Sequence, residues 1–254
     1  LKGKIQHYAW GGYQYIPRLL HEANPDHVPF AEYWLGAHDK APSDLLSAGT
    51  STPLDRFIAR DPGKYLGTAT AREFGRLPYL LKILDVRDML SIQVHPTREE
   101  ARIGFARENE MEIPLDSPKR NYKDDNHKPE MMVALSEFYL LHGFREDGSL
   151  RDILAATPEL KSLATYYDKK GYQALYAQVM RMPQFRVNEM LQPLLRRVSP
   201  PYQAGRTPKD HPDFWAARAL ASGMTTLEAP DRGIFSIYFF PLVRMAPGEG
   251  IFQA

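Results

Sequence analysis

The first 100 residues alternate short apolar runs with turn-forming residues. The runs at 77–84 and 91–95 are set off from their neighbours by Gly, Pro, Asp and Ser. Strands of four to eight residues bounded by such turn residues are typical of β-sandwiches and small barrels. This part of the chain is therefore predicted to be built from short strands.

A helix and two further strands are predicted next. Thr97 and Glu100 have the spacing of a capping box, which predicts a short helix starting after Thr97. Prolines and charges dominate residues 110–126 and predict a loop. The apolar run 131–135 then predicts a strand with Glu130 at its mouth, and 137–144 predicts the next strand.

Beyond residue 148 the apolar positions change to a helical period. They recur at helical spacing in two stretches between residues 151 and 198, which predicts two amphipathic helices. Pro193 is expected to kink the second of them. Asp210 is expected to cap a third helix, with Pro212 in its first turn.

The strand pattern returns after these helices. It covers residues 234–243 and appears again at Ile251 and Phe252. Because strand segments lie on both sides of the helices, we predict a mainly β fold, a jelly-roll sandwich or barrel, with an internal helical insertion. The expected division is a β domain at 1–147, the insertion at 148–222 and a return to the β domain at 223–254.

Composition limits the classes of partner. The 254 residues are 43% hydrophobic and 25% charged, with a formal net charge of +1, so no global field draws the chain to nucleic acid or to an anionic membrane. The sequence has no cysteine, which excludes disulfides and thiolate metal sites. No signal peptide or transmembrane run is recognisable. We expect a cytoplasmic protein without nucleic-acid or membrane partners.

Three side chains are candidates for a metal centre. Gln93 and His95 lie two residues apart, so on a strand both would face the same side. Glu130 would add a carboxylate. An imidazole, a carboxylate and a neutral oxygen suit zinc (Zn²⁺) or another divalent first-row metal, although glutamine is not a usual zinc ligand. On the residues alone, a hydrogen-bonded structural histidine and a solvated ion pair of Glu130 with Lys128 remain alternatives.

Lys128 and Ser91 extend the candidate site, because each lies two residues from one of these candidate ligands. Only Pro129 separates Lys128 from Glu130, so in an extended chain both face one cavity, where Lys128 could transfer a proton or stabilise an oxyanion. Ser91 would share the face of Gln93. The alternatives are a surface lysine in a loop and a plain structural serine.

Four separated blocks of sequence carry a family resemblance. They are IQHYAWGG at 5–12, PFAEYWLGAH at 29–38 followed by Pro42 and Ser43, LPYLLKIL at 77–84 leading into SIQVHP at 91–96, and NYKDDNHKPE at 121–130. The resemblance returns at 233–236 and 247–252. With these blocks in this order, the chain resembles the type I phosphomannose isomerases. These are metal-dependent cupins that interconvert mannose 6-phosphate and fructose 6-phosphate.

The resemblance implies a cupin fold, one zinc ion held by Gln93, His95 and Glu130, and catalysis through an enediolate with Lys128 as the catalytic candidate. The metal would act as a Lewis acid. A small sugar phosphate is the implied partner of a monomer or weak oligomer, and the implied substrate-binding residues are Ser91, Trp10, Glu32 and Lys82. Trp34, in the same block as Glu32, is expected to be core.

One departure from the family leaves alternatives open. A histidine ligand follows the 247–252 type of segment in the family, and basic phosphate-binding residues come later, whereas this sequence stops at Ala254. We expect those groups beyond Ala254, and weak metal binding and little turnover from these residues alone, as an inactive fragment of the isomerase. A non-catalytic sugar-phosphate-binding or regulatory cupin is one alternative, and a cupin isomerase with another epimer preference is a second.

Overall fold

The computed structural model describes residues 1–47 and 49–253. The chain divides into two compact units, residues 1–90 and 91–254. Over the described residues, helices account for 42% and strands for 16%, so the mainly β expectation is not confirmed. The strands are short and form small separate sheets, which is why the strand share is low.

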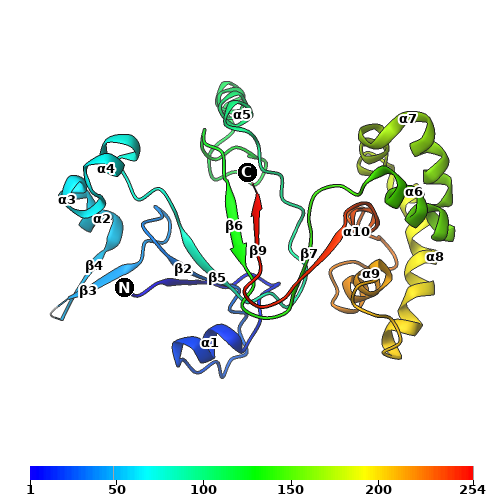
Figure 1. Cartoon of the computed structure of the whole chain (residues 1–254), viewed down its shortest axis with the longest axis horizontal. Helices are drawn as coiled ribbons and strands as arrows, with labels where there is room; N and C mark the ends of the chain where they lie inside the picture. Colours follow the sequence, from blue (N-terminus) through cyan, green and yellow to red (C-terminus); the bar gives the residue numbers. More distant parts are fainter. Residues whose placement is uncertain (48, 254) are drawn as a thin grey trace. The chain divides into compact units, whose positions relative to one another are not determined.

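In the first unit, a three-stranded antiparallel sheet has β2 at its centre, between β1 and β5 (Figure 1). The run predicted as a strand at 77–84 forms one only in its second half, because Pro78 has no N–H to donate to a ladder. The elements of this unit are β1 (Lys4–Gln6), α1 (Tyr15–Leu20), β2 (Glu32–Leu35), β3 (Asp44–Ser47), β4 (Thr50–Pro53), α2 (Leu54–Ala59), α3 (Pro62–Leu66), α4 (Thr68–Phe74) and β5 (Leu81–Leu84).

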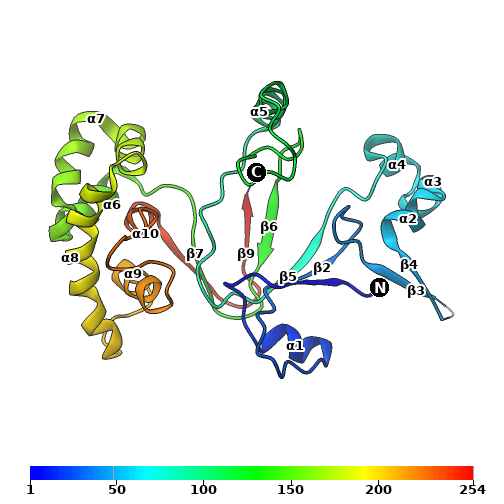
Figure 2. The ribbon, with the colours of Figure 1, turned by 180° about the vertical axis from the view of Figure 1, so that it is seen from behind.

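The strands of the second unit form two antiparallel pairs. Strand β6 (Glu130–Val133) pairs with β9 (Gly250–Gln253), and β7 (Phe138–Leu141) pairs with β8 (Leu242–Met245). Both views show β6 and β9 side by side (Figures 1 and 2). The strands predicted at 131–135 and 137–144 are thus confirmed in place, although both are shorter. The predicted strand at Ile251 and Phe252 is part of β9.

The strand predicted at 91–95 is wrong. Residues 91–97 have no regular secondary structure, and no described strand pairs with them. The capping box at Thr97 and Glu100 is confirmed, and it starts helix α5 (Arg98–Glu110) directly after this segment. Without a partner strand, the local apolar alternation is not enough to make a strand.

Helices make up most of the rest of the second unit and gather in one group (Figures 1 and 2). The two helices predicted between residues 151 and 198 correspond to α7 and α8. Pro193, the expected position of a kink, lies inside α8, which continues through it without a break. The interruption is in α7 instead, at Gly171, which has φ 75° and ψ 178°. The elements are α6 (Asp147–Ala156), η1 (Pro158–Leu160), α7 (Lys161–Met180), α8 (Gln184–Gln203), α9 (Pro212–Ala221) and α10 (Ile234–Phe239).

Two predictions near α9 and α10 need correction. His211, not Asp210, caps α9, because its Nδ1 accepts from the backbone N–H of Asp213 at 3.2 Å; Pro212 does occupy the first turn. Residues 234–239 form helix α10 instead of a strand. All six residues of α10 are buried, and a short, fully buried apolar run has no period that separates helix from strand.

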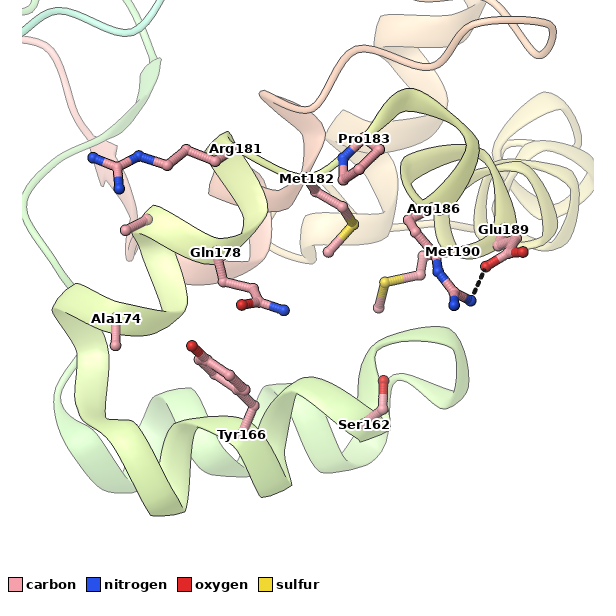
Figure 3. Close-up of a pocket in the computed structure, with 11 residues that line it drawn as sticks. Ser162, Tyr166, Ala174, Gln178, Arg181, Met182, Pro183, Arg186, Glu189 and Met190 are labelled. Carbon is pink, nitrogen blue, oxygen red and sulfur yellow. Dashed lines mark hydrogen bonds and ion pairs between the residues drawn. The ribbon is translucent and has the colours of Figure 1, made fainter.

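A groove of about 700 Å³ lies between the two halves of α7 and the start of α8. Tyr166, Gln178, Met182 and Met190 point into it (Figure 3), and Arg186 at its edge pairs with Glu189 at 2.7 Å. None of the candidate site residues lines this groove. No helix within residues 1–47 and 49–253 combines the length and apolar character needed to cross a membrane.

Candidate metal centre

His95 and Glu130 lie next to each other in the second unit. The His95 Nε2 atom is 3.7 Å from Glu130 Oε2; the His95 side chain is 10% exposed and that of Glu130 61%. His95 lies in the irregular 91–97 segment, and Glu130 is the first residue of β6. Two ligand atoms on a tetrahedral zinc, with bonds of about 2.0–2.2 Å, lie roughly 3.3–3.6 Å apart. The observed 3.7 Å is just above this range, so a small approach of the exposed Glu130 side chain would let both groups bind one ion.

The second ring nitrogen of His95, Nδ1, is buried and has no hydrogen-bond partner among the described residues. A buried, unpaired polar atom is costly, because it gives up its hydrogen bond to water. Apart from the contact with Glu130, the imidazole thus keeps its capacity for a further ligand or donor partner.

The Gln93 side chain is exposed, and only its amide nitrogen makes hydrogen bonds within the described part of the chain. Its Nε2 donates to the backbone oxygen of Ser91 at 3.1 Å and to Ser91 Oγ at 3.0 Å. The amide nitrogen is thus engaged, and the amide oxygen is the atom that could bind a metal. Within residues 1–47 and 49–253, no group of three or more His, Cys, Asp or Glu side chains could hold a metal. A centre on His95 and Glu130 therefore needs a ligand of another type, and Gln93 stays the predicted one.

Lys128 lies just before β6, not within it. Its Nζ is 3.5 Å from Asp124 Oδ2, and the two side chains are 59% and 45% exposed. The two-residue period of a strand therefore does not fix its direction relative to Glu130. The neighbouring His127 contacts Arg98 through Nε2 at 3.4 Å. A catalytic role for Lys128 stays a prediction.

The first unit brings two of the predicted substrate residues together. The buried Glu32 carboxylate accepts from Trp34 Nε1 at 2.5 Å and lies 3.6 Å from Lys82 Nζ. The Lys82 ammonium also stands over the Trp34 ring, 4.9 Å from its centroid. The sheet explains this cluster, because Trp34 is paired with Lys82 and shares a face with Glu32 two residues away.

Trp10 stacks on Tyr8 with ring centroids 5.7 Å apart. Burial raises the pKa of the Tyr8 phenol, and the negative charge of Glu32 raises it further, so Tyr8 lies within the field of the cluster. Gly11 makes the close approach of this segment possible, since a Cβ there would lie 2.6 Å from the Ala31 backbone. Tyr8 was not among the residues predicted for the site, and Trp34, expected to be core, is only half-buried. Trp34 lies two residues from Glu32 on the same strand, and this spacing alone places both side chains on one face of the sheet.

Residues 1–147 match the family model of the phosphomannose isomerase type I catalytic domain. The chain belongs to the type I phosphomannose isomerase family. The resemblance found in the sequence blocks is thus confirmed.

Named relatives extend the match over nearly the whole chain. The mannose-6-phosphate isomerase of Escherichia coli K12 is 35% identical over 257 residues, covering 99% of this chain and 63% of the relative. The human mannose-6-phosphate isomerase is 31% identical over 273 residues, covering 98% of this chain and 61% of the relative. The chain therefore spans about three fifths of the length of these relatives.

Solved structures show the same similarity. The mannose 6-phosphate isomerase of Salmonella typhimurium bound to fructose 6-phosphate and zinc gives a TM-score of 0.84 at 32% identity, covering 100% of this chain and 62% of the other. A zinc-bound holo structure of a mannose 6-phosphate isomerase gives 0.82 at 32% identity, covering 99% and 62%. The backbone described above is thus similar to that of this family's enzymes.

Proposed function

We propose that the protein interconverts mannose 6-phosphate and fructose 6-phosphate, with one Zn²⁺ held by Gln93, His95 and Glu130. The observation that supports this most directly is the 3.7 Å approach of His95 Nε2 to Glu130 Oε2 in a chain of this family. The ligands named for the similar Salmonella structure, fructose 6-phosphate and zinc, are those that this proposal assigns here.

The reaction needs a proton to move between two carbons beside a carbonyl. Bound zinc supplies a Lewis acid that stabilises negative charge on the substrate oxygen. Lys128 is the proposed group for carrying the proton or for stabilising that oxygen with its charge. For either task its ammonium must leave Asp124, and because both side chains are about half exposed, that pair is weak.

The substrate-binding residues are proposed as Ser91, Trp10, Glu32 and Lys82. The buried carboxylate of Glu32 can accept hydrogen bonds from sugar hydroxyls, and Lys82 provides a positive charge held beside it. Trp10 offers an aromatic face, stacked on Tyr8. Ser91 Oγ is 3.0 Å from the amide nitrogen of Gln93, so it adjoins a proposed metal ligand.

We infer a cupin fold, with the division at 1–147, 148–222 and 223–254; the similarity to phosphomannose isomerase structures supports the fold. A cytoplasmic location and a monomeric or weakly associating state stay predictions.

The test is an isomerase assay of the full-length protein, before and after metal removal. Fructose 6-phosphate formation from mannose 6-phosphate should stop after chelation and return when zinc is added. A protein that binds the sugar phosphate without converting it would instead be a non-catalytic relative. Turnover that survives complete metal removal would refute the zinc assignment.

A further inference from the structure

Neither residue of the proposed metal pair is held by a regular element on both sides. His95 lies in the irregular 91–97 segment, and Glu130 follows a long irregular segment, 111–129. Helix α5 lies between these two segments in the sequence, and β6 begins at the end that lies nearest α5 (Figures 1 and 2). Helix α5 is therefore the regular element that adjoins both irregular segments.

Glu108 on α5 fastens the 111–129 segment to the helix. Its carboxylate accepts from the backbone N–H of Tyr122 at 2.8 Å, from the N–H of Asn121 at 3.1 Å and from Asn121 Nδ2 at 2.9 Å. The Glu108 side chain is only 4% exposed. A buried carboxylate with this many donors holds the backbone it contacts in one place.

Arg120, which belongs to the 111–129 segment, pairs with Glu108, and we call these two residues with their hydrogen bonds the clasp. Arg120 donates to the carbonyl oxygens of Tyr122 at 2.7 Å and Ile113 at 2.6 Å, and to Asn109 Oδ1 at 2.6 Å. Its Nε lies 3.4 Å from Glu108 Oε2, and its side chain is 1% exposed. Burying such a pair costs desolvation free energy, and removal of one partner leaves an uncompensated charge.

The packing of Tyr122 shows how closely the segment lies on α5. A Cβ placed on Gly104 would be 2.4 Å from the Tyr122 ring, so only glycine allows this contact. Ala101, Gly104 and Glu108 are the buried residues of α5 and share one face of it. That face carries the 111–129 segment.

The other end of α5 reaches the same two regions. The Thr97 capping box fixes the start of the helix two residues after His95. Arg98, in the first turn, is 3.4 Å from His127 Nε2, three residues before Glu130. Helix α5 therefore contacts the chain on the approach to each metal-ligand candidate.

We propose that α5 sets the separation of His95 and Glu130, and that Glu108 and Arg120 are positioning residues for the metal site. This inference rests on the proposed zinc function. The clasp touches no ligand atom; it acts by fixing the 111–129 segment, whose end places Glu130.

The test compares matched variants of the full-length protein. Glu108→Gln and Arg120→Lys are set against Glu110→Gln and Arg107→Lys, which change exposed residues of α5. Zinc affinity is measured by competition with a chromophoric chelator. We expect the two clasp variants to bind zinc about tenfold more weakly, the low end of the effect of removing a group that hydrogen-bonds a metal ligand, because the clasp acts on Glu130 through the backbone; the controls should stay within about twofold.

Hydrogen exchange of the metal-free protein gives the second readout. Amides of the 111–129 segment should exchange faster in Glu108→Gln than in Glu110→Gln. Faster exchange with unchanged zinc affinity would overturn the proposal, since the clasp would then hold the segment without placing the ligand. Equal exchange in both variants would overturn it as well.

Two further cases are distinguishable. If Glu108→Gln does not fold, Gly104→Ala gives the same comparison, because its methyl group displaces Tyr122 from α5; Gly148→Ala, with open space around its Cβ, is the control. If the wild type neither binds zinc nor isomerises sugar phosphate, the proposed function fails and the positioning role falls with it. Exchange in the 111–129 segment would still report the clasp itself.

Discussion

The hydroxyl of Tyr238 donates to Asp213 Oδ1 at 2.7 Å in the centre of the helical group. Tyr238 is fully buried, and burial, followed by the charge of Asp213, holds the pKa of its phenol far above the ordinary value. The tyrosine therefore keeps its proton, and donates, well above the pH at which an ordinary phenol ionises. Asp213 also lies 3.0 Å from Arg197, whose guanidinium binds Glu159 at 2.8 Å.

Arg197→Met should destabilise the helical group. It leaves Glu159 and Asp213, which are 11% and 17% exposed, without their shared cation. We expect a loss of about 2 kcal/mol in the free energy of unfolding, measured by urea denaturation. Arg196→Met, one residue away on the exposed side of α8, should change it by less than about 0.5 kcal/mol. Equal effects of the two variants would contradict the network.

Gly171→Ala tests the break in α7. With φ 75° and ψ 178°, Gly171 occupies a region nearly restricted to glycine, so alanine should cost about 2 kcal/mol although its Cβ meets no atom within 4 Å. Gly148→Ala in α6 has equally open space without a positive φ and should be neutral or slightly stabilising. Thermal denaturation of both variants makes the comparison. A neutral Gly171→Ala would mean that α7 is continuous.

Lys128→Met tests the proposed catalytic lysine in the full-length protein. The change keeps the side chain's length and removes its ammonium, so kcat should fall by at least about 10² with zinc content unchanged. Asp124→Asn removes the partner seen in the structure and should leave kcat nearly intact. If the Lys128→Met variant instead loses zinc, Lys128 supports the metal ligand Glu130, and another group carries the proton.

The clasp of Glu108 predicts a dependence on pH. Hydrogen bonds from the Tyr122 N–H, which come first, and from Asn121, with the charge of Arg120, hold the pKa of Glu108 below its ordinary value of 4.5 against the opposing effect of burial. A carboxyl with a lowered pKa in the folded state stabilises fully above the ordinary value, and this stabilisation is lost as the pH falls below it. The difference in thermal midpoint between wild type and Glu108→Gln should therefore be largest near pH 7 and shrink below about pH 4.5.

The parts of the fold that could be predicted are those with a clear local signal. The capping box at Thr97 and the apolar period of α7 and α8 predict helices that the structure confirms, because helices are stabilised by contacts between residues close in sequence. The predictions of strands at 91–95 and 234–239 are wrong: the first segment is irregular and the second forms helix α10. A strand exists only with a partner, and a fully buried helix shows no polar side.

The candidate site shows the same division. The pairing of His95 with Glu130 follows from the family wording of two blocks, and the structure places them 3.7 Å apart. The clasp of Glu108 with Arg120 was not predicted, because it joins residues 12 apart across an irregular segment that has no period. Buried charges in such segments become visible only in three dimensions.

The proposed zinc site is tested most directly by metal analysis after dialysis, together with isomerase activity, of the full-length protein and of its His95→Gln and Glu130→Gln variants. His142→Gln, a histidine just after β7, is the control. We expect one zinc per chain in the wild type and the control, and loss of both zinc and turnover in the other two variants. Retention of zinc and of mannose 6-phosphate isomerisation by His95→Gln would contradict the proposed zinc site.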